Sequence, residues 1–352
     1  MSAAAKVWIC VGAALLATGC SHHGKPSSGT PAARAATTTS APSAAASASA
    51  AGSLSPAPAR SPAGTSTAAA GSATCATARP GANGTASAEV AVRGAPARRY
   101  LRYLPAAYDG LHRLPVVFNF HGYGATSDEQ MLYSGLYAVA ERKGFVVVAV
   151  DGQGDPLHYN VRATTHGGEV SDVQVVVAVL DQVSKSLCLD PKRVYATGMS
   201  DGGALAAALG CFASDRFAAV APVAALIYDP SCAKAKPVPL MAFRGTADEI
   251  VPYGGGAVAC CGNPVVNPTR QDIASWAKHN GCGPTPAVTT RGAVETSSYT
   301  GCTGGADVVL HTVVGGGHTW PGAISLPGLG VTTRDIDASA AMWDFFAAHP
   351  KG

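Results

Sequence analysis

One serine in a glycine-rich turn is the strongest chemical signal in the sequence. Residues 198–203 read Gly-Met-Ser-Asp-Gly-Gly, with Ser200 at the third position. The preceding run, residues 192–197, reads as a short buried strand, and residues 204–209 read as the first turns of a helix. A strand, a sharp Gly-x-Ser-x-Gly turn and a helix form a nucleophile elbow, in which a strained turn exposes the serine hydroxyl. We therefore predict that Ser200 is a nucleophile; the alternative is a glycine-rich surface loop.

A serine hydroxyl needs a base to take its proton and a carboxylate to orient that base. Behind an elbow of this kind, the partners follow in the chain order serine, acid, histidine, each at the carboxyl end of a strand. Asp248 follows an expected strand at 238–244, and His318 follows an expected strand at 307–314 on a run of three glycines. We therefore predict a catalytic triad of Ser200, Asp248 and His318. The alternatives are a loop-capping aspartate and an ordinary loop histidine.

The tetrahedral intermediate of acyl transfer carries an oxyanion, which hydrogen-bond donors must stabilise. One donor is expected from the residue after the nucleophile and another from the loop after an early strand. The sequence His-Gly-Tyr-Gly at 121–124 follows the expected strand at 115–121, so we assign the backbone N–H groups of Tyr123 and Asp201 to the oxyanion hole. We expect His121 to support this loop, and the Tyr123 side chain either to line the substrate pocket or to pack.

Three other titratable residues are weaker candidates for chemistry. Asp151 follows an expected strand and is the rival acid, but it precedes the serine in the chain. Asp172 is expected to cap or pair within its helix. His311 lies within an expected strand, where we expect a structural role.

Strands and helices that position these residues alternate along the chain. The expected strands cover residues 90–92, 99–104, 115–121, 145–150, 192–197, 217–224, 238–244 and 307–314. The expected helices cover residues 130–142, 169–187, a run from 204, 271–280 and 335–348. Apolar central strands that alternate with helices predict an α/β fold, with a doubly wound, mostly parallel sheet and helices on both faces.

The first 74 residues differ in composition from the rest of the 352-residue chain. Residues 1–20 hold one lysine and a short apolar run, which predicts a signal peptide, and Leu-Ala-Thr-Gly-Cys at its end predicts a lipidated Cys20. Plain secretion is the alternative. Residues 21–74 offer almost nothing to bury, so we expect a disordered Ala/Ser/Thr/Pro linker. Residues 75–352 suit one catalytic domain, expected outside the cell and anchored to the outer face of the membrane.

Composition argues against several classes of partner. The net charge is only +3 and no basic stripe is present, so we expect no nucleic-acid partner. No second apolar run is long enough to cross a membrane, so membrane contact is expected only through the N-terminal lipid. We expect the protein to be a monomer. We also expect no metal site, because no cysteine pair or histidine cluster has a metal-ligand spacing.

Two disulfides can be predicted from the positions of the cysteines. Of ten cysteines, two lie within the first 20 residues, and the even number that remains in an exported chain favours disulfides. Cys282 and Cys302 flank an expected hairpin at 286–300, so we pair them. Cys211 ends the helix after the elbow and Cys232 lies past the following strand and loop, so we pair these as well.

Four cysteines remain, two of them adjacent in the chain. Neighbouring cysteines seldom bond each other, because a vicinal bridge strains the peptide between them. We therefore expect Cys260 and Cys261 to pair with Cys75 and Cys188, in an order that the sequence leaves open.

Four motifs together resemble one known family. HGYG, CLDPKRVYATGMSDGG, FRGTADEIVPY and GGGHTWPG occur in that order. The set is similar to the polyhydroxybutyrate depolymerases and the feruloyl and acetylxylan esterases of the α/β-hydrolase superfamily, over residues 90–350. The resemblance implies Ser200 as nucleophile, His318 as general base and Asp248 as its orienter. It also implies that Trp320 forms a wall of the substrate cleft.

Two positions depart from the pattern of this family. Residues 158–166 contain no tryptophan, although the family often has one in this region. Arg244 stands where the family usually has histidine. Both departures bear on the expected substrate pocket and leave the triad unaffected.

The motifs and the resemblance predict an exported serine carboxylic-ester hydrolase that works through an acyl-enzyme, without a metal or organic cofactor. The expected substrate is a hydroxyalkanoate oligomer, or an acyl or feruloyl ester on plant cell-wall polysaccharide. Because the sequence ends soon after the last expected helix, we expect no appended polymer-binding module, which favours soluble oligomers and cell-wall esters. The alternative of another class is a non-catalytic or acyl-transferring cell-wall protein on the same fold.

Overall fold

The structure, a computed structural model, describes residues 74–162 and 169–352. The predicted signal peptide with Cys20, and all of the predicted linker except Thr74, lie outside the described residues. No helix in the described part of the chain is both long enough and apolar enough to cross a membrane.

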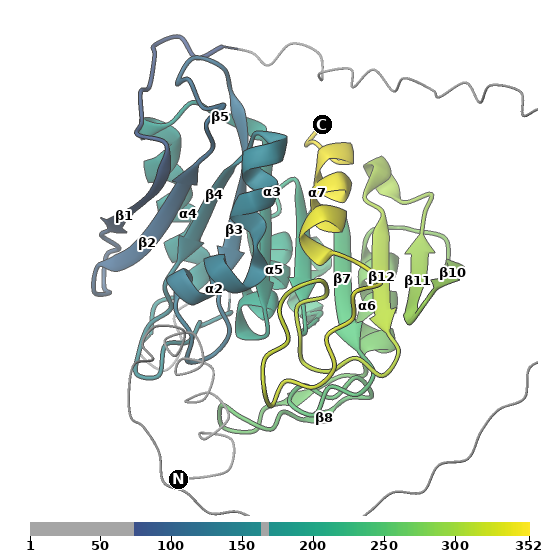
Figure 1. The fold of residues 1–352 in the computed structure, drawn as a ribbon. Helices are drawn as coiled ribbons and strands as arrows, with labels where there is room; N and C mark the ends of the chain where they lie inside the picture. Colours follow the sequence, from purple (N-terminus) through teal and green to yellow (C-terminus); the bar gives the residue numbers. More distant parts are fainter. Residues whose placement is uncertain (1–73, 163–168) are drawn as a thin grey trace, which may run out of the picture. The chain divides into compact units, whose positions relative to one another are not determined.

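A ten-stranded sheet runs through the described domain in the order β1-β2-β4-β3-β5-β6-β7-β12-β11-β10 (Figure 1). Its strands are β1 (Gly84–Val90), β2 (Arg98–Leu104), β3 (Leu114–Phe120), β4 (Val146–Val150), β5 (Leu189–Met199), β6 (Ala219–Val223), β7 (Leu240–Gly245), β10 (Ala287–Arg291), β11 (Val294–Tyr299) and β12 (Val308–Val313). The neighbouring strands from β4 to β12 run parallel, and antiparallel pairings add two strands at each edge. A separate ribbon pairs β8 (Gly256–Ala257) with β9 (Val265–Val266).

Helices cover both faces of this sheet (Figure 1). They are α2 (Ser127–Ser134), α3 (Leu136–Lys143), α4 (Asp172–Ser186), α5 (Asp201–Phe212), α6 (Thr269–His279) and α7 (Ala338–Ala348), with short 3-10 turns η1 (Pro230–Lys234) and η2 (Thr303–Gly305). Val176 of α4, Leu205 of α5 and Trp276 of α6 are buried in one core cluster. Val139 of α3 and Phe346 of α7 are buried in a second cluster on the opposite face. This arrangement confirms the predicted fold class.

The central strands are apolar because helices cover them on both sides. All five residues of β4, Val-Val-Val-Ala-Val, are buried, as expected for a strand between two helical layers. The parallel pairings from β5 through β6 and β7 to β12 bring the carboxyl ends of these strands together at one end of the sheet. In open α/β sheets, binding sites form at the carboxyl ends of the strands.

Two predicted elements differ from the structure. The helix predicted at 130–142 is two helices, α2 and α3, because Gly135 between them adopts a left-handed conformation with φ of 61°. Thr126 forms a capping box at the start of α2, before Ser127. The strand predicted at 90–92 is displaced: β1 ends at Val90, and backbone pairing with β2 rather than apolar content defines it.

Four disulfides join the cysteines of the described domain: Cys75–Cys188, Cys211–Cys232, Cys260–Cys261 and Cys282–Cys302. The structure therefore joins both pairs that the sequence predicts. Cys211 lies in the last turn of α5 and Cys232 lies in η1. The second pair closes the segment that holds the hairpin of β10 and β11.

The partners expected for Cys260 and Cys261 are wrong, because these two neighbours bond each other. Cys188 directly precedes β5, and the backbone N–H of Cys75 donates to the carbonyl of Leu111 (2.9 Å), shortly before β3. Cys75 and Cys188 thus meet at the amino ends of the parallel strands. Cys260 and Cys261 lie between β8 and β9, beyond the carboxyl end of β7. The two pairs lie at opposite ends of the parallel strands, so a cysteine of one pair cannot bond a cysteine of the other.

Removing the Cys75–Cys188 bridge should destabilise the domain strongly. The bridge closes a loop with a sequence separation of 113 residues, so its loss should lower the free energy of unfolding by about 4–5 kcal/mol in the chain-entropy picture. The measurement is denaturant unfolding of a Cys75→Ala/Cys188→Ala protein without reductant. The matched control is Cys260→Ala/Cys261→Ala, which opens no long loop and should lose less than about 1 kcal/mol. Equal losses in the two proteins would contradict this account.

Candidate active site

Ser200 occupies a strained turn between β5 and α5. Its backbone has φ of 57° and ψ of −118°, a region that non-glycine residues rarely adopt. The Ser200 N–H donates to the carbonyl of Val223 at the end of β6 (2.8 Å), which fixes the turn against the neighbouring strand. Strain of this kind persists only where the surroundings enforce it, and it is concentrated at functional sites.

Glycines around Ser200 are required by close backbone contacts. A Cβ at Gly198 would lie 2.5 Å from the carbonyl oxygen of Gly202. A Cβ at Gly202 would lie 2.3 Å from the carbonyl oxygen of Phe120 at the end of β3. A Cβ at Gly203 would lie 2.8 Å from the Val223 carbonyl oxygen. These contacts are those of a strand–turn–helix elbow packed against two neighbouring strands, and they disfavour the alternative of a surface loop.

Asp248 lies on the loop after β7 and is 6% exposed. One carboxylate oxygen accepts the backbone N–H groups of Ile250 (3.0 Å) and Val251 (2.8 Å). The other oxygen lies 2.9 Å from Nδ1 of His318. Burial raises the pKa of Asp248, but the charge and hydrogen bond of His318, the charge of Arg244 and the N–H of Val251 together outweigh burial, so the pKa is lowered from its ordinary value. The carboxylate is therefore held ionised and fixed in orientation.

His318 lies on the glycine-rich loop after β12 and is 1% exposed. This loop and the Asp248 loop contact each other closely, because the N–H of Ala247 donates to the carbonyl of Gly316 (2.9 Å). A Cβ at Gly245 would lie 2.3 Å from the same carbonyl oxygen. Nδ1 of His318 faces Asp248, while Nε2 is buried without a hydrogen-bond partner in the described residues. The imidazole therefore presents one unoccupied nitrogen, the atom that a general base uses.

Arg244 links the nucleophile side of the site to the acid side. It is 2% exposed and donates to the carbonyl of Ala224, the residue that follows the Ser200 contact on β6. It also donates to the carbonyl of Val251 (2.8 Å), whose N–H holds Asp248. Its charge contributes to the low pKa of Asp248. The expected bearing of Arg244 on the substrate pocket is not supported; the side chain is buried and ties two loops together.

The two predicted oxyanion donors, the N–H groups of Tyr123 and Asp201, have no other hydrogen-bond acceptor among the described residues. His121 is fully buried, with Nδ1 2.8 Å from the carbonyl of Gly122, and Nε2 accepts the N–H of Gly152 (2.8 Å). Burial lowers the pKa of His121 to about 4, so the ring is neutral and supports the loop, as expected.

The Asp201 carboxylate orders the segment that contains Tyr159. Its Oδ2 accepts the backbone N–H of Tyr159 (2.8 Å). Burial raises the pKa of Asp201 to about 6. The carboxylate therefore titrates close to neutral pH.

Asp201→Asn should change how stability depends on pH. Because the pKa of Asp201 is about 6 in the folded state and the ordinary value is 3.8, the folded chain holds this proton more tightly than the unfolded chain. The wild-type free energy of unfolding should therefore fall as pH rises from about 4 to about 6. The variant lacks this loss and should be more stable at pH 7–8 by about 1–3 kcal/mol. Thermal unfolding at pH 4, 5, 6 and 7.5 measures the effect; a pH-independent difference between the two proteins would contradict it.

Other predicted site residues prove to be structural or change role. Trp320 is 1% exposed and its indole N–H donates to Ser339 on α7 (3.0 Å), so the expected role as a substrate wall is not supported. Tyr123 is half-buried, with its ring 6.1 Å from that of His158. Asp151 accepts the N–H of Ser127 (2.7 Å) at the start of α2.

Two further residues also have structural partners. Asp172 pairs with Arg98 on β2 at 2.6 Å, rather than within its own helix as expected. His311 is buried against Phe243, with its Nδ1 2.8 Å from the hydroxyl of Thr296. Burial lowers the pKa of His311 to about 4, which agrees with a structural role. In the described residues, no group of three or more His, Cys, Asp or Glu side chains is placed to hold a metal ion.

Comparison with known proteins agrees with this geometry. Residues 98–265 match the family described as esterase PHB depolymerase, a range that contains both Ser200 and Asp248. The chain is 29% identical over 316 residues to the putative esterase NocK of Nocardia uniformis, an alignment that covers 83% of this chain and 91% of that protein. The chain is therefore similar to known esterases in sequence.

Other esterases are similar to this chain over part of their length. Feruloyl esterase B of Piromyces equi is 31% identical over 228 residues, which cover 63% of this chain and 42% of that protein. The chain thus spans less than half the length of this relative. The solved acetyl xylan esterase of Aspergillus awamori superposes with a TM-score of 0.50 at 15% identity, over 71% of this chain and 94% of that one. At this identity the superposition supports the fold alone.

Proposed function

We propose that this protein hydrolyses carboxylic esters through an acyl-enzyme on Ser200. The observation that carries the proposal is the buried Asp248–His318 pair, whose Nε2 has no partner among the described residues. Ser200, at the end of β5, is fixed to β6, and β7 and β12 follow next in the sheet. The serine, the acid and the base therefore follow the carboxyl ends of neighbouring parallel strands.

Each step of the proposed reaction assigns a task to a named group. Nε2 of His318 accepts the proton of the Ser200 hydroxyl as its oxygen attacks the ester carbonyl carbon. The N–H groups of Tyr123 and Asp201 stabilise the oxyanion that forms. The imidazolium then protonates the leaving alcohol, and the acyl group remains on the serine. Water attacks this acyl-enzyme by the same proton transfers, which releases the carboxylic acid and restores the hydroxyl.

The substrate classes that we propose are hydroxyalkanoate oligomers and acylated or feruloylated cell-wall polysaccharide. The matched family description names PHB depolymerase, and similar proteins are named feruloyl esterases and an acetyl xylan esterase. The names divide between these substrates, so the choice depends on direct assay. An acyl-transferring wall protein is the alternative of another class, and it would need an acceptor alcohol in place of water.

Export is part of the same proposal. The predicted signal peptide and Cys20 support secretion followed by lipid anchoring at the outer face of the membrane. The four disulfides of the described domain also favour an oxidising compartment. Accumulation of an unprocessed, unlipidated chain inside the producing cell would contradict it.

Hydrolysis of p-nitrophenyl acetate tests the activity, and three substrates test its class. The purified protein is assayed with a 3-hydroxybutyrate trimer, methyl ferulate and acetylated xylan in parallel. We expect hydrolysis of p-nitrophenyl acetate and a clear preference for one of the three substrates. Release of product only when an alcohol acceptor is added would favour the acyl-transferring alternative. No turnover of any ester would overturn the proposed function.

A further inference from the structure

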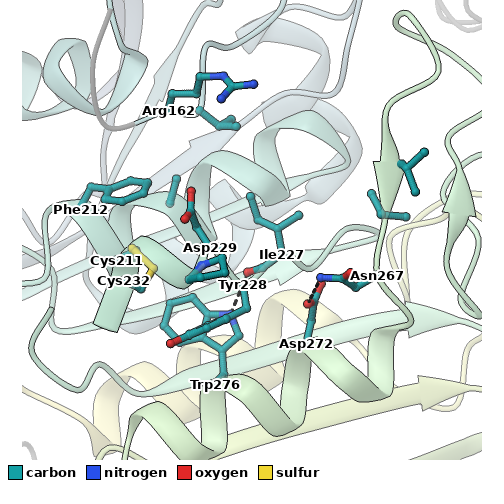
Figure 2. A pocket seen from close by; sticks show the side chains of 16 residues that line it. Arg162, Cys211, Phe212, Ile227, Tyr228, Asp229, Cys232, Asn267, Asp272 and Trp276 are labelled. Carbon is teal, nitrogen blue, oxygen red and sulfur yellow. Dashed lines mark hydrogen bonds between the residues drawn. A yellow bond between two sulfur atoms is a disulfide. The ribbon is translucent and has the colours of Figure 1, made fainter. Parts of the chain in front are cut away.

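A second feature lies near the site: a cavity of about 420 Å³ between α5 and α6 (Figure 2). Its volume is within the range of small-molecule sites, about 300–1,000 Å³. Its lining includes Ala207 and Ala208 of α5 and Asp272 and Trp276 of α6. The cavity includes none of the predicted catalytic residues, and neither the motifs nor the reaction above account for it.

Three chain segments lead from Ser200 to this cavity. On α5, the 3.6-residue period puts Ala204 and Ala208 on the same helix face as Ser200. Ala207 lies about 10 Å from Ser200 along the helix axis. From Val223, whose carbonyl accepts the Ser200 N–H, the chain continues to Ile227 in the cavity wall. The cavity wall on α5 therefore lies about two helical turns from the nucleophile.

The third segment starts at the residue next to the nucleophile. The Asp201 carboxylate accepts the N–H of Tyr159, and the chain continues from there to Val161 and Arg162 at the cavity. Figure 2 shows the Arg162 side chain on the opposite side of the cavity from Trp276. Segments that contact the elbow thus form walls of the cavity within a few residues.

The cavity combines a flat aromatic surface with hydrogen-bonding groups. The Tyr228 ring is half-buried and is braced edge-on by Trp276, with 5.6 Å between the ring centroids. Asp229 is exposed at the cavity, and Asn267 donates to the buried carboxylate of Asp272 (2.9 Å), an interaction drawn in Figure 2. Burial raises the pKa of Asp272. Carboxylates and amides around an aromatic face suit a ligand that has both apolar faces and hydroxyl groups.

We propose that this cavity binds the saccharide part of an acylated polysaccharide while its ester lies at Ser200. The proposal rests on the proposed function and selects one of its substrate classes. Between its ends, a hydroxyalkanoate oligomer offers ester carbonyls and alkyl groups but no hydrogen-bond donor. The carboxylates of Asp229 and Asp272 accept hydrogen bonds, and saccharide hydroxyls supply the donors. The Tyr228 ring provides a surface for the apolar face of a sugar.

The ratio of kcat/KM for a feruloylated xylo-oligosaccharide to kcat/KM for methyl ferulate tests the saccharide site. For Tyr228→Ala, kcat/KM for a feruloylated xylo-oligosaccharide should fall at least fivefold more than kcat/KM for methyl ferulate, with the difference mainly in KM. Asp229→Asn keeps an oxygen for the cap at Ser231 and should show the same direction, about threefold. The control Tyr137→Ala changes a tyrosine that is 38% exposed on α3, remote from the cavity, and should leave the ratio unchanged. Equal losses on both substrates would overturn the proposal.

A binding measurement separates this proposal from the proposed activity. Ser200→Ala protein is titrated by calorimetry with xylotetraose, which carries no ester, and with a 3-hydroxybutyrate trimer. We expect xylotetraose to bind, and the additional change Tyr228→Ala to weaken this binding at least fivefold. No binding of xylotetraose, or stronger binding of the hydroxybutyrate trimer, would overturn the saccharide site. Because this readout needs no turnover, it holds even if wild-type protein fails to hydrolyse any ester.

Discussion

Ser200→Ala is expected to lower kcat for p-nitrophenyl acetate by about 10,000-fold or more. The alanine lacks the oxygen that attacks the carbonyl, so the acyl-enzyme cannot form. The oxyanion donors and the substrate contacts remain, so a small residual rate over water is expected. Initial rates at saturating substrate measure the effect, with far-UV circular dichroism to show that the variant is folded.

A second serine provides the matched control for this result. Ser186 ends α4, and within the described part of the chain its hydroxyl donates only to the helix carbonyls of Gln182 and Val183. Ser186→Ala should keep kcat within about twofold of wild type. A Ser200→Ala protein that retains more than a few per cent of the wild-type rate would show that another residue attacks the ester.

Asp248→Asn is expected to lower kcat by about 1,000- to 10,000-fold while KM changes little. The carboxylate accepts the Nδ1 proton of His318 at 2.9 Å, which leaves Nε2 as the basic nitrogen. An amide nitrogen in this position favours the opposite tautomer, in which Nε2 carries the proton and cannot take another. Loss of the charge also removes stabilisation of the imidazolium. The measurement is kcat and KM from full saturation curves for p-nitrophenyl acetate.

The rival acid supplies the control for Asp248. Asp151 also follows a parallel strand, but its carboxylate holds the start of α2 and pairs with Arg99 at 2.9 Å. Asp151→Asn should therefore lower the free energy of unfolding by about 1–2 kcal/mol and keep kcat within about fivefold. The opposite ranking, with Asp151→Asn inactive and Asp248→Asn active, would assign the acid to Asp151.

Local patterns were enough to predict most of the fold and the order of the site residues. The elbow could be predicted because Gly198 and Gly202 leave no room for a side chain, so the requirement appears directly in the sequence. The central strands were recognisable because both of their faces are buried, which makes runs such as Val146–Val150 continuously apolar. The positions of Asp248 and His318 followed from the rule that active residues lie at the carboxyl ends of parallel strands.

Features that depend on distant packing could not be predicted in the same way. Trp320 follows the motif of the predicted catalytic histidine, but its burial depends on α7 and Ser339, which only the fold brings near. Arg244 was recognisable as a departure, but its two carbonyl partners lie on different loops. The bridge between Cys260 and Cys261 could not be predicted, because it depends on which end of the parallel strands each cysteine occupies. The cavity beside α5 joins segments that are far apart in the sequence, and no single motif marks it.

Covalent labelling tests the central claim most directly. The purified protein is treated with a fluorophosphonate, which reacts with activated serines, and is then digested and mapped by mass spectrometry. The account predicts one adduct per chain, on the peptide that contains Ser200, with no adduct in Ser200→Ala protein and much slower labelling of Asp248→Asn protein. An adduct on a different residue, or no adduct on a protein that still hydrolyses p-nitrophenyl acetate, would contradict it.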